Sequence, residues 1–360
     1  MLVENHKTIG ECLVMIGKSK KQPVDFQINN IELSARLTYI RGIAIIGVIL
    51  IHTTAGNIQP HISDLNQVMS WRAFLALVLN QMGRFAVPVF LLLSGVGLTL
   101  SNKESAPYMG FIWSRIKKLL PAYLVWTFVY FLLGRQYNYY VFGKTLFGLS
   151  THLYFIPLLL SLYMLYPVLR RLAKSLWGLG SVLCLLIFSE VAFFITGMPL
   201  LRQWINPCNW AFYFVLGIWI VPYLGHLQKL LRWKHVIFYM LACLLTIAEA
   251  LLWSGKVGLN SAASAQKPSV VLLTIGAFYL MMNISKRFKV IDLIAKHSFL
   301  IYLSHMAFLT VIAAIFRRLG ISWLFASLGT IVVLLISLLF SILCQKMKAW
   351  FRGWSGEKFA

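Results

Sequence analysis

The chain has 360 residues, of which 12% are charged, 59% hydrophobic and 14% aromatic. Its 33 Lys and Arg against 10 Asp and Glu give a formal net charge of +23 at pH 7, and its mean hydropathy is +0.77. Soluble domains carry about 25% charged residues, so this composition excludes a soluble single core, a disordered chain and a coiled coil. The basic residues punctuate long apolar runs and form no separate basic domain, so we expect no nucleic-acid partner.

Ten segments are apolar over the roughly 20 residues that a membrane-spanning helix needs. They are approximately 37–56, 72–100, 119–134, 152–169, 176–196, 208–223, 236–253, 269–284, 296–316 and 322–344. The sequence therefore predicts an all-α, polytopic membrane protein with about ten transmembrane helices in one bundle. We expect this domain over residues 36–345, with cytoplasmic tails at residues 1–35 and 346–360.

The distribution of basic residues supports this count of helices. With a cytoplasmic N-terminus, 23 Lys and Arg lie on the inside segments and 7 on the outside loops, and the remaining three lie in or beside spans. Inside segments of membrane proteins carry such an excess, and a miscounted helix would scramble the alternation. We therefore expect both termini to lie inside, against anionic headgroups of the lipid bilayer.

The cysteines give no sign of a metal site. Cys12, Cys184, Cys208, Cys243 and Cys344 lie far apart and form no CxxC or metal-ligand spacing. No segment resembles an ATP-binding loop either. We expect neither a bound metal nor a bound cofactor.

Arg41 and His52 form a distinctive pair in the first span. They are 11 positions apart, so at 100° per residue both side chains leave the same face of a helix, roughly 16 Å apart along its axis. Arg41, nearer the cytoplasm, suits a phosphate, and His52 suits general-base work. The alternative is that Arg41 snorkels to the interface and His52 bonds a neighbouring helix. Because both residues lie on one helix face, we favour a functional role over this alternative.

Other ionisable residues fall within or beside the apolar spans, where charges are costly and often functional. They are Arg84, His152, Glu190, Glu249 and His305. Glu190 and Glu249 receive no role, because pairing between helices also explains them. For His305, packing and a second functional imidazole are equally favoured. In the second span, Pro88 should kink the helix.

The Arg41–Ala44 stretch running to His52, with ten residues between Arg and His, resembles the first-helix motif of the acyltransferase-3 family of integral membrane acyltransferases. Further segments follow in the family's order: Arg84–Phe90 (RFAVPVF) with Ser94–Gly95, Arg115–Pro121 (RIKKLLP), His152–Pro157 (HLYFIP) and Ser298–His305 (SFLIYLSH). The second motif, with its Arg84 and Pro88, is most similar to that of one branch of the family. This branch includes the enterobacterial-common-antigen O-acetyltransferase and the membrane protein of the poly-N-acetylglucosamine locus.

The resemblance implies a multi-pass enzyme of a bacterial cell membrane that transfers an acyl group other than an aminoacyl group. Acetyl or succinyl would pass from cytoplasmic acyl-CoA, a co-substrate, to a hydroxyl of an envelope carbohydrate or lipid-linked glycan. Residue by residue, it makes His52 the catalytic base and Arg41 a donor-binding residue. Lys118 stands where many relatives have Arg, and it keeps the charge without the planar fork.

The remaining site residues follow from a mechanistic hypothesis. Arg115 and Lys118 would bind donor phosphates, although such basic residues are also ordinary positive-inside flanks. Arg84 would stabilise the oxyanion, and His152 and Tyr154 would contact the acceptor, although Tyr154 also fits an interfacial belt of aromatic residues.

A transporter or flippase for a polysaccharide or lipid-linked glycan is the rival function. We find no internal symmetry of the kind that transporters show, which favours the enzyme.

Overall fold

The computed structural model describes residues 30–58, 70–101, 108–135, 137–224, 232–284 and 286–354, and every regular element in these ranges is helical. The α-helices are α2 (Asn30–Ile58), α3 (Trp71–Gly83), α4 (Ala86–Leu100), α5 (Tyr108–Leu133), α6 (Tyr139–Leu146), α7 (Phe155–Met164), α8 (Tyr166–Leu172), α9 (Leu176–Thr196), α10 (Ala211–Trp219), α11 (Arg232–Val257), α12 (Leu259–Ala262), α13 (Ser269–Met282), α14 (Lys289–Arg318) and α15 (Thr330–Trp354). The prediction of an all-α protein is confirmed.

Short 3₁₀ and π elements connect several of these helices. They are η3 (His152–Tyr154), η4 (Pro199–Arg202), η5 (Pro207–Asn209), η6 (Val221–Tyr223), η8 (Ser322–Leu324) and η9 (Phe325–Gly329). The chain divides into two compact units, Met1–Ala35 and Arg36–Ala360. The second unit holds α2 from Arg36 onward and every later element, whereas most of the expected N-terminal tail lies outside the described residues.

Seven helical stretches in the described ranges are long and apolar enough to cross a membrane. They are Glu32–Gly56, Trp71–Leu100, Tyr108–Leu133, Leu176–Thr196, Trp233–Val257, Lys289–Arg318 and Phe325–Trp350. His152–Met164 and Tyr166–Leu172, bent by 70°, form an eighth if they are one span. The chain is thus a multi-pass membrane protein.

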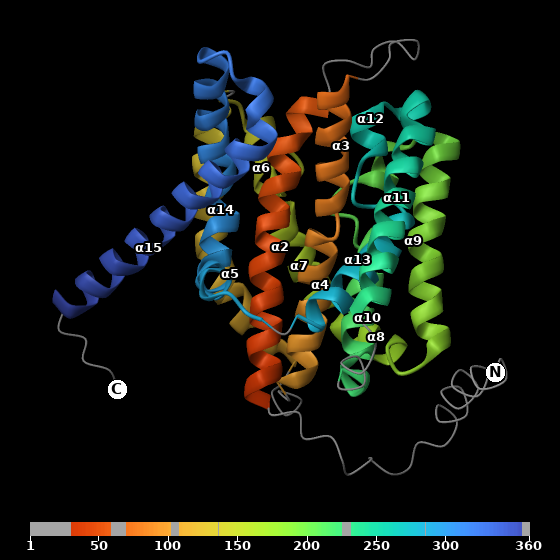
Figure 1. Ribbon diagram of the computed structural model, residues 1–360. Helices are drawn as coiled ribbons and strands as arrows, with labels where there is room; N and C mark the ends of the chain where they lie inside the picture. The colour runs from red at the N-terminus through yellow and green to blue at the C-terminus, as the bar shows by residue number, and fades with distance from the viewer. Residues whose placement is uncertain are drawn as a thin grey trace. The chain divides into compact units, whose positions relative to one another are not determined.

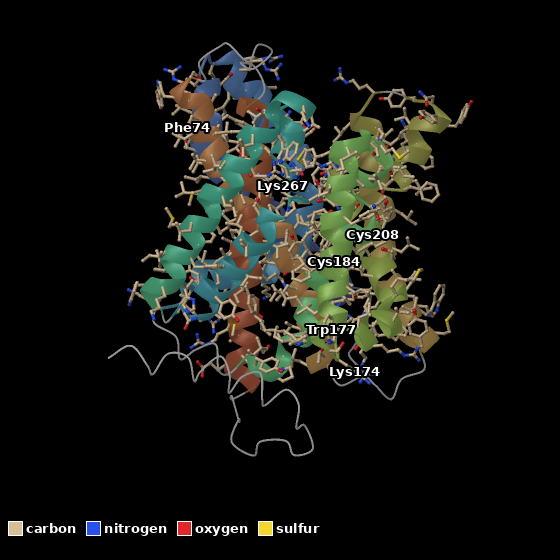
Figure 2. All side chains as sticks on the ribbon, turned by 90° about the vertical axis from the view of Figure 1, so that its right-hand side faces the viewer. Phe74, Lys174, Trp177, Cys184, Cys208 and Lys267 are labelled. Carbon is tan, nitrogen blue, oxygen red and sulfur yellow. The ribbon has the colours of Figure 1, made fainter. Side chains whose placement is uncertain are left out.

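The two other expected segments, 208–223 and 269–284, contain helices shorter than a full span. Helix α10 has 9 residues and α13 has 14. Each is preceded by irregular chain, which includes η4 and η5 before α10 and residues 263–268 before α13. Figure 2 shows Phe74 of α3 and Lys174, just before α9, near opposite ends of the helices. Which end faces the cytoplasm stays a prediction.

Close helix contacts through glycine set the position of α2, the helix that carries Arg41 and His52. Figure 1 shows α2 between α14 and the α3–α4 pair. A Cβ on Gly42 would lie 2.4 Å from the backbone oxygen of Ile291 in α14, and one on Gly47 would lie 3.0 Å from the Cβ of Ala86 in α4. Small residues allow such close approach between membrane helices.

A two-residue interruption separates α3 from α4 just before Pro88, where the sequence predicts a kink. Helix α3 ends at Gly83 and α4 begins at Ala86, with Arg84 and Phe85 in turn conformation. Proline has no N–H to bond the carbonyl four residues earlier, which is that of Arg84, and its ring crowds that carbonyl. Arg84, which the sequence assigns to the site, is thus the residue that follows α3.

Gly95 on α4 gives a test of helix packing. A Cβ there would lie 2.2 Å from the backbone oxygen of Phe214 in α10, so Gly95→Ala should push the helices apart and lower stability by about 1–3 kcal/mol. Gly97 lies on the same helix with nothing within 4 Å of a Cβ, so Gly97→Ala should leave stability unchanged or raise it. Thermal unfolding of the purified protein in detergent measures both, and equal midpoints would contradict the packing.

Candidate active site

Three histidines far apart in the sequence meet inside the bundle. His52 comes from α2, His152 from η3 at the start of α7, and His305 from the middle of α14. The ring centroids of His52 and His305 are 5.3 Å apart, those of His152 and His305 4.8 Å, and those of His52 and His152 6.2 Å. The structure therefore brings together the three imidazoles that the sequence singled out.

One backbone carbonyl orients two of these rings. The oxygen of Tyr302 accepts from Nε2 of His152 at 3.1 Å and from Nδ1 of His305 at 2.7 Å. A carbonyl only accepts, so the proton of each ring lies on the bonded nitrogen. In the neutral ring, Nε2 of His305 is then an acceptor, and it is buried without a hydrogen-bond partner in the described residues. Tyr302 also donates its hydroxyl to the backbone oxygen of His152 at 2.5 Å.

Tyr130 of α5 packs against His152, and the sequence analysis did not identify it as a site residue. Its ring meets that of His152 edge-on at 4.9 Å. Its hydroxyl donates to the backbone oxygen of Leu303 at 2.7 Å and accepts from the N–H of Ala307 at 3.2 Å. A tyrosine inside an apolar span was the available signal, since its hydroxyl needs a partner there.

Arg84 lies beside the histidines at the α3–α4 break. Its side chain is buried, and its Nε donates to Oδ1 of Asn80 at 2.9 Å. It is close enough to His52 and to Tyr154 to interact with both electrostatically. Tyr154 in turn packs on Trp204, with ring centroids 5.4 Å apart. A fixed cation, an aromatic pair and the imidazoles thus share one region.

The other end of α2 holds a separate basic group. Arg41 is exposed, and Arg115 of α5 lies over the ring of Tyr163 with 5.7 Å from its guanidinium carbon to the centroid. Tyr163, near the end of α7, is close enough to both arginines to interact with them electrostatically. Lys118 is exposed, and no hydrogen bond or ion pair to it is found in the described part of the chain. Sequence reasoning missed Tyr163.

The spacing of Tyr163 could have revealed it. Tyr163 follows His152 by 11 positions, as His52 follows Arg41. His152 lies near His52, and Tyr163 lies near Arg41. The two segments therefore run in opposite directions along the bundle. On the unbroken helix α2, Arg41 and His52 are roughly 16 Å apart along the axis.

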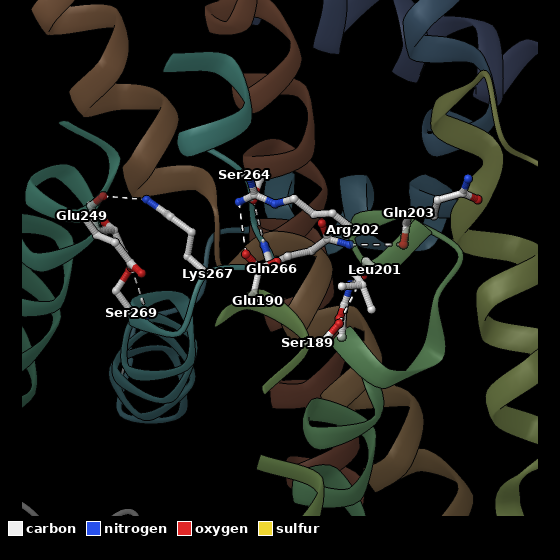
Figure 3. Close-up of polar contacts among 12 residues, drawn as sticks. Ser189, Glu190, Leu201, Arg202, Gln203, Glu249, Ser264, Gln266, Lys267 and Ser269 are labelled. Carbon is white, nitrogen blue, oxygen red and sulfur yellow. Dashed lines mark hydrogen bonds and ion pairs between the residues drawn. The ribbon is translucent and has the colours of Figure 1, made fainter. Parts of the chain in front are cut away.

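Glu190, to which the sequence assigned no role, forms a buried ion pair. Figure 3 shows Arg202 reaching toward both Glu190 and Ser264. Nη2 of Arg202 is 3.3 Å from Oε2 of Glu190, and it donates to Oγ of Ser264 at 2.7 Å. Its guanidinium carbon lies 4.7 Å from the ring centroid of Phe193. Removal of charges from water is costly, so each partner depends on the other.

Lys267, in the irregular chain between α12 and α13, is wholly buried. Its Nζ donates to Oε1 of Gln81 at 2.8 Å and to the backbone oxygen of Thr246 at 2.6 Å. Glu249 accepts from the backbone N–H of Ser269 at 3.2 Å (Figure 3). These contacts tie the irregular chain before α13 to α3 and α11.

Comparison with known proteins bears on most of this chain. Residues 34–342 match the acyltransferase-3 family model, which describes an acyltransferase domain. The matched range includes every candidate site residue from Arg41 to His305. The comparisons with curated proteins and with solved structures find no match. Within the described ranges, no group of three or more His, Cys, Asp or Glu has the arrangement needed to hold a metal ion.

The Glu190–Arg202 pair predicts a pattern of stability. Arg202→Met leaves Glu190 buried without its counter-charge and should cost about 3 kcal/mol of unfolding free energy. The double variant Arg202→Met/Glu190→Leu removes both charges and should recover part of that loss. Lys256→Met, at an exposed cation on α11, is the control and should change little. Thermal unfolding in detergent measures all three, and a double variant no more stable than the single one would refute the pairing.

Proposed function

Because the chain belongs to the acyltransferase-3 family of integral membrane acyltransferases, we propose that it moves an acetyl or succinyl group from cytoplasmic acyl-CoA to a hydroxyl of a cell-envelope carbohydrate or lipid-linked glycan. The family makes the chain a membrane enzyme that transfers an acyl group other than an aminoacyl group. The donor, the acyl group, the acceptor, the bacterial cell membrane and the branch of the family belong to the proposal.

The observation that carries the proposal is the convergence of His52, His152 and His305 at one level of the bundle. Ring centroids 4.8 to 6.2 Å apart put three imidazoles within reach of one reacting group. Arg84 lies beside them as a fixed cation. Imidazoles move protons and a cation stabilises developing negative charge, which are the two tasks of acyl transfer from a thioester.

The basic group at the other end of α2 supports a binding place for the donor. Arg41 is exposed, so its guanidinium is accessible to a phosphate, and Arg115 lies near it across Tyr163. Arginine bonds phosphate with charge-assisted, often paired hydrogen bonds. The flexible pantetheine arm of the donor would then cover the distance along α2 to the histidines.

In the reaction, His52 accepts the proton of the acceptor hydroxyl as the hydroxyl oxygen attacks the thioester carbonyl. The carbonyl oxygen becomes an oxyanion, which Arg84 stabilises. When the tetrahedral intermediate collapses, the carbon–sulfur bond breaks and the proton passes from His52 to the leaving thiolate. The products are an ester and free CoA, and no other co-reactant is needed.

The surroundings of His52 suggest how the acceptor binds. Tyr154 and Trp204 pack together close to Arg84, and aromatic rings suit the apolar faces of a sugar. His305 presents the unpartnered Nε2 in the same region. It therefore supports His52, either by receiving the proton or by holding the acceptor hydroxyl.

The central prediction concerns His52. Acyl transfer from radiolabelled acetyl-CoA or succinyl-CoA in membranes should fall by about 10²- to 10⁴-fold in His52→Ala, because a general base contributes that much. His235→Ala, at a histidine stacked on Tyr279 outside the cluster, should keep activity at matched protein levels. Equal label in wild type and His52→Ala would refute the base. Movement of a glycan without consumption of acyl-CoA would instead support the rival flippase.

A second prediction separates the two ends of α2. Arg41→Ala and Arg115→Ala should each raise the KM for acyl-CoA about tenfold with little change in kcat, because a charge-assisted hydrogen bond contributes about 1.5 kcal/mol. Lys117→Ala, at an exposed lysine near Arg115, is the matched control and should leave KM within twofold. A fall in kcat at unchanged KM would contradict a donor-binding role for these arginines.

A further inference from the structure

One carboxamide links α3 to the turn of α2 that carries His52. Asn80 of α3 is wholly buried. Its Nδ2 donates to the backbone oxygen of Ile51 at 2.9 Å and to Oγ1 of Thr54 at 2.9 Å. Ile51 directly precedes His52 in α2, so the position of Asn80 is tied to the position of the imidazole.

The same carboxamide holds Arg84. Oδ1 of Asn80 accepts from Nε of Arg84 at 2.9 Å and from Nε2 of Gln81 at 3.2 Å. With two bonds from its nitrogen and two to its oxygen, the amide has its full set of partners. It can therefore neither turn nor flip without loss of hydrogen bonds that hydrocarbon cannot replace.

Gln81 and Lys267 fix this carboxamide from the side away from α2. Nε2 of Gln81 donates to the backbone oxygen of Ala263 at 3.1 Å, and Oε1 of Gln81 accepts from Nζ of Lys267 at 2.8 Å. Lys267 is anchored by Thr246 of α11 at 2.6 Å. A continuous chain of hydrogen bonds thus runs from α11 through Lys267, Gln81 and Asn80 to Arg84.

Arginine has a long side chain with many rotamers, and errors of about 1 Å in the position of a catalytic group can cost 10²-fold in rate. We propose that Asn80 is a positioning residue that holds the Arg84 guanidinium at a fixed place beside His52, with Gln81 and Lys267 supporting it. This role rests on the proposed function, in which Arg84 stabilises the oxyanion.

The polar character of these three buried side chains argues against a purely structural role. Asn80, Gln81 and Lys267 are all 0% exposed. Well-packed apolar residues would fill this volume without the cost of desolvating two amides and an ammonium group. The hydrogen bonds among these three polar side chains end at Arg84, to which Asn80 bonds directly.

The test compares the same substitution in two backgrounds. Asn80→Leu in the wild type should lower kcat for acyl transfer 10- to 100-fold and leave the KM for acyl-CoA within twofold. In the Arg84→Met background, where there is no guanidinium to place, Asn80→Leu should change the residual kcat less than twofold. Residues that act as one unit show this non-additivity. An equal fold loss in both backgrounds, or a rise in KM at unchanged kcat, would overturn the proposal.

A second variant keeps the test decisive if Asn80→Leu does not fold. Lys267→Met removes the support for Gln81 and replaces a buried cation by an apolar side chain of similar length. It should lower kcat about 5- to 30-fold in the wild type and less than twofold in the Arg84→Met background, and equal losses would again overturn the proposal. Ser341→Ala, which removes a buried bond to Nδ1 of His297, is the control and should leave kcat unchanged in both.

The same measurements separate failure of this proposal from failure of the proposed function. If the wild type transfers label and the two backgrounds lose activity equally, only the positioning role fails. If the wild type transfers no label from either acyl-CoA in membranes that supply its acceptor, the proposed function fails and the positioning role fails with it.

Discussion

Polar groups inside a bundle that faces lipid find partners only within the bundle, because hydrocarbon offers none. This requirement explains the geometry of the site. The carbonyl of Tyr302 is shared by His152 and His305, which places a proton on the bonded nitrogen of each ring and leaves the buried Nε2 of His305 without a partner in the described residues. Asn80 likewise has all its partners, and Arg84 is one of them. His152, His305 and Arg84 are therefore held by hydrogen bonds that hydrocarbon could not replace.

Helix α2 sets the distance between the two ends of the site. It is unbroken from Asn30 to Ile58, so the separation of Arg41 and His52 follows from the helical rise and does not depend on loop geometry. The close contacts at Gly42 and Gly47 seat α2 against α14 and α4. The helices that bring His305 and Arg84 are thus packed directly on the helix that carries His52. A donor bound at Arg41 and a reaction at His52 follow from the same rigid element.

The sequence was sufficient where a feature depends on one helix. The spacing of Arg41 and His52 predicted a shared face because both lie on α2. Pro88 marked the place where α3 and α4 are interrupted, because its effect reaches only four residues back. The convergence of His52, His152 and His305 needed the tertiary structure. No spacing within a single segment shows that η3 and α14 meet beside α2, and the resemblance alone drew these residues together.

The sequence could not show that half of the site is built from interrupted helices. An apolar run indicates burial in lipid or protein, but it does not tell a full span from irregular chain that leads into a short helix. The breaks at Arg84, at η4 and before α13 contact one another, since Lys267 bonds Gln81 and Arg202 bonds Ser264. Backbone of this kind is tolerated at membrane depth only where protein or a polar cavity surrounds it. The polar groups of the irregular chain before α10 and α13 find their partners in one another and in α3, as Arg202 does at Ser264 and Lys267 at Gln81.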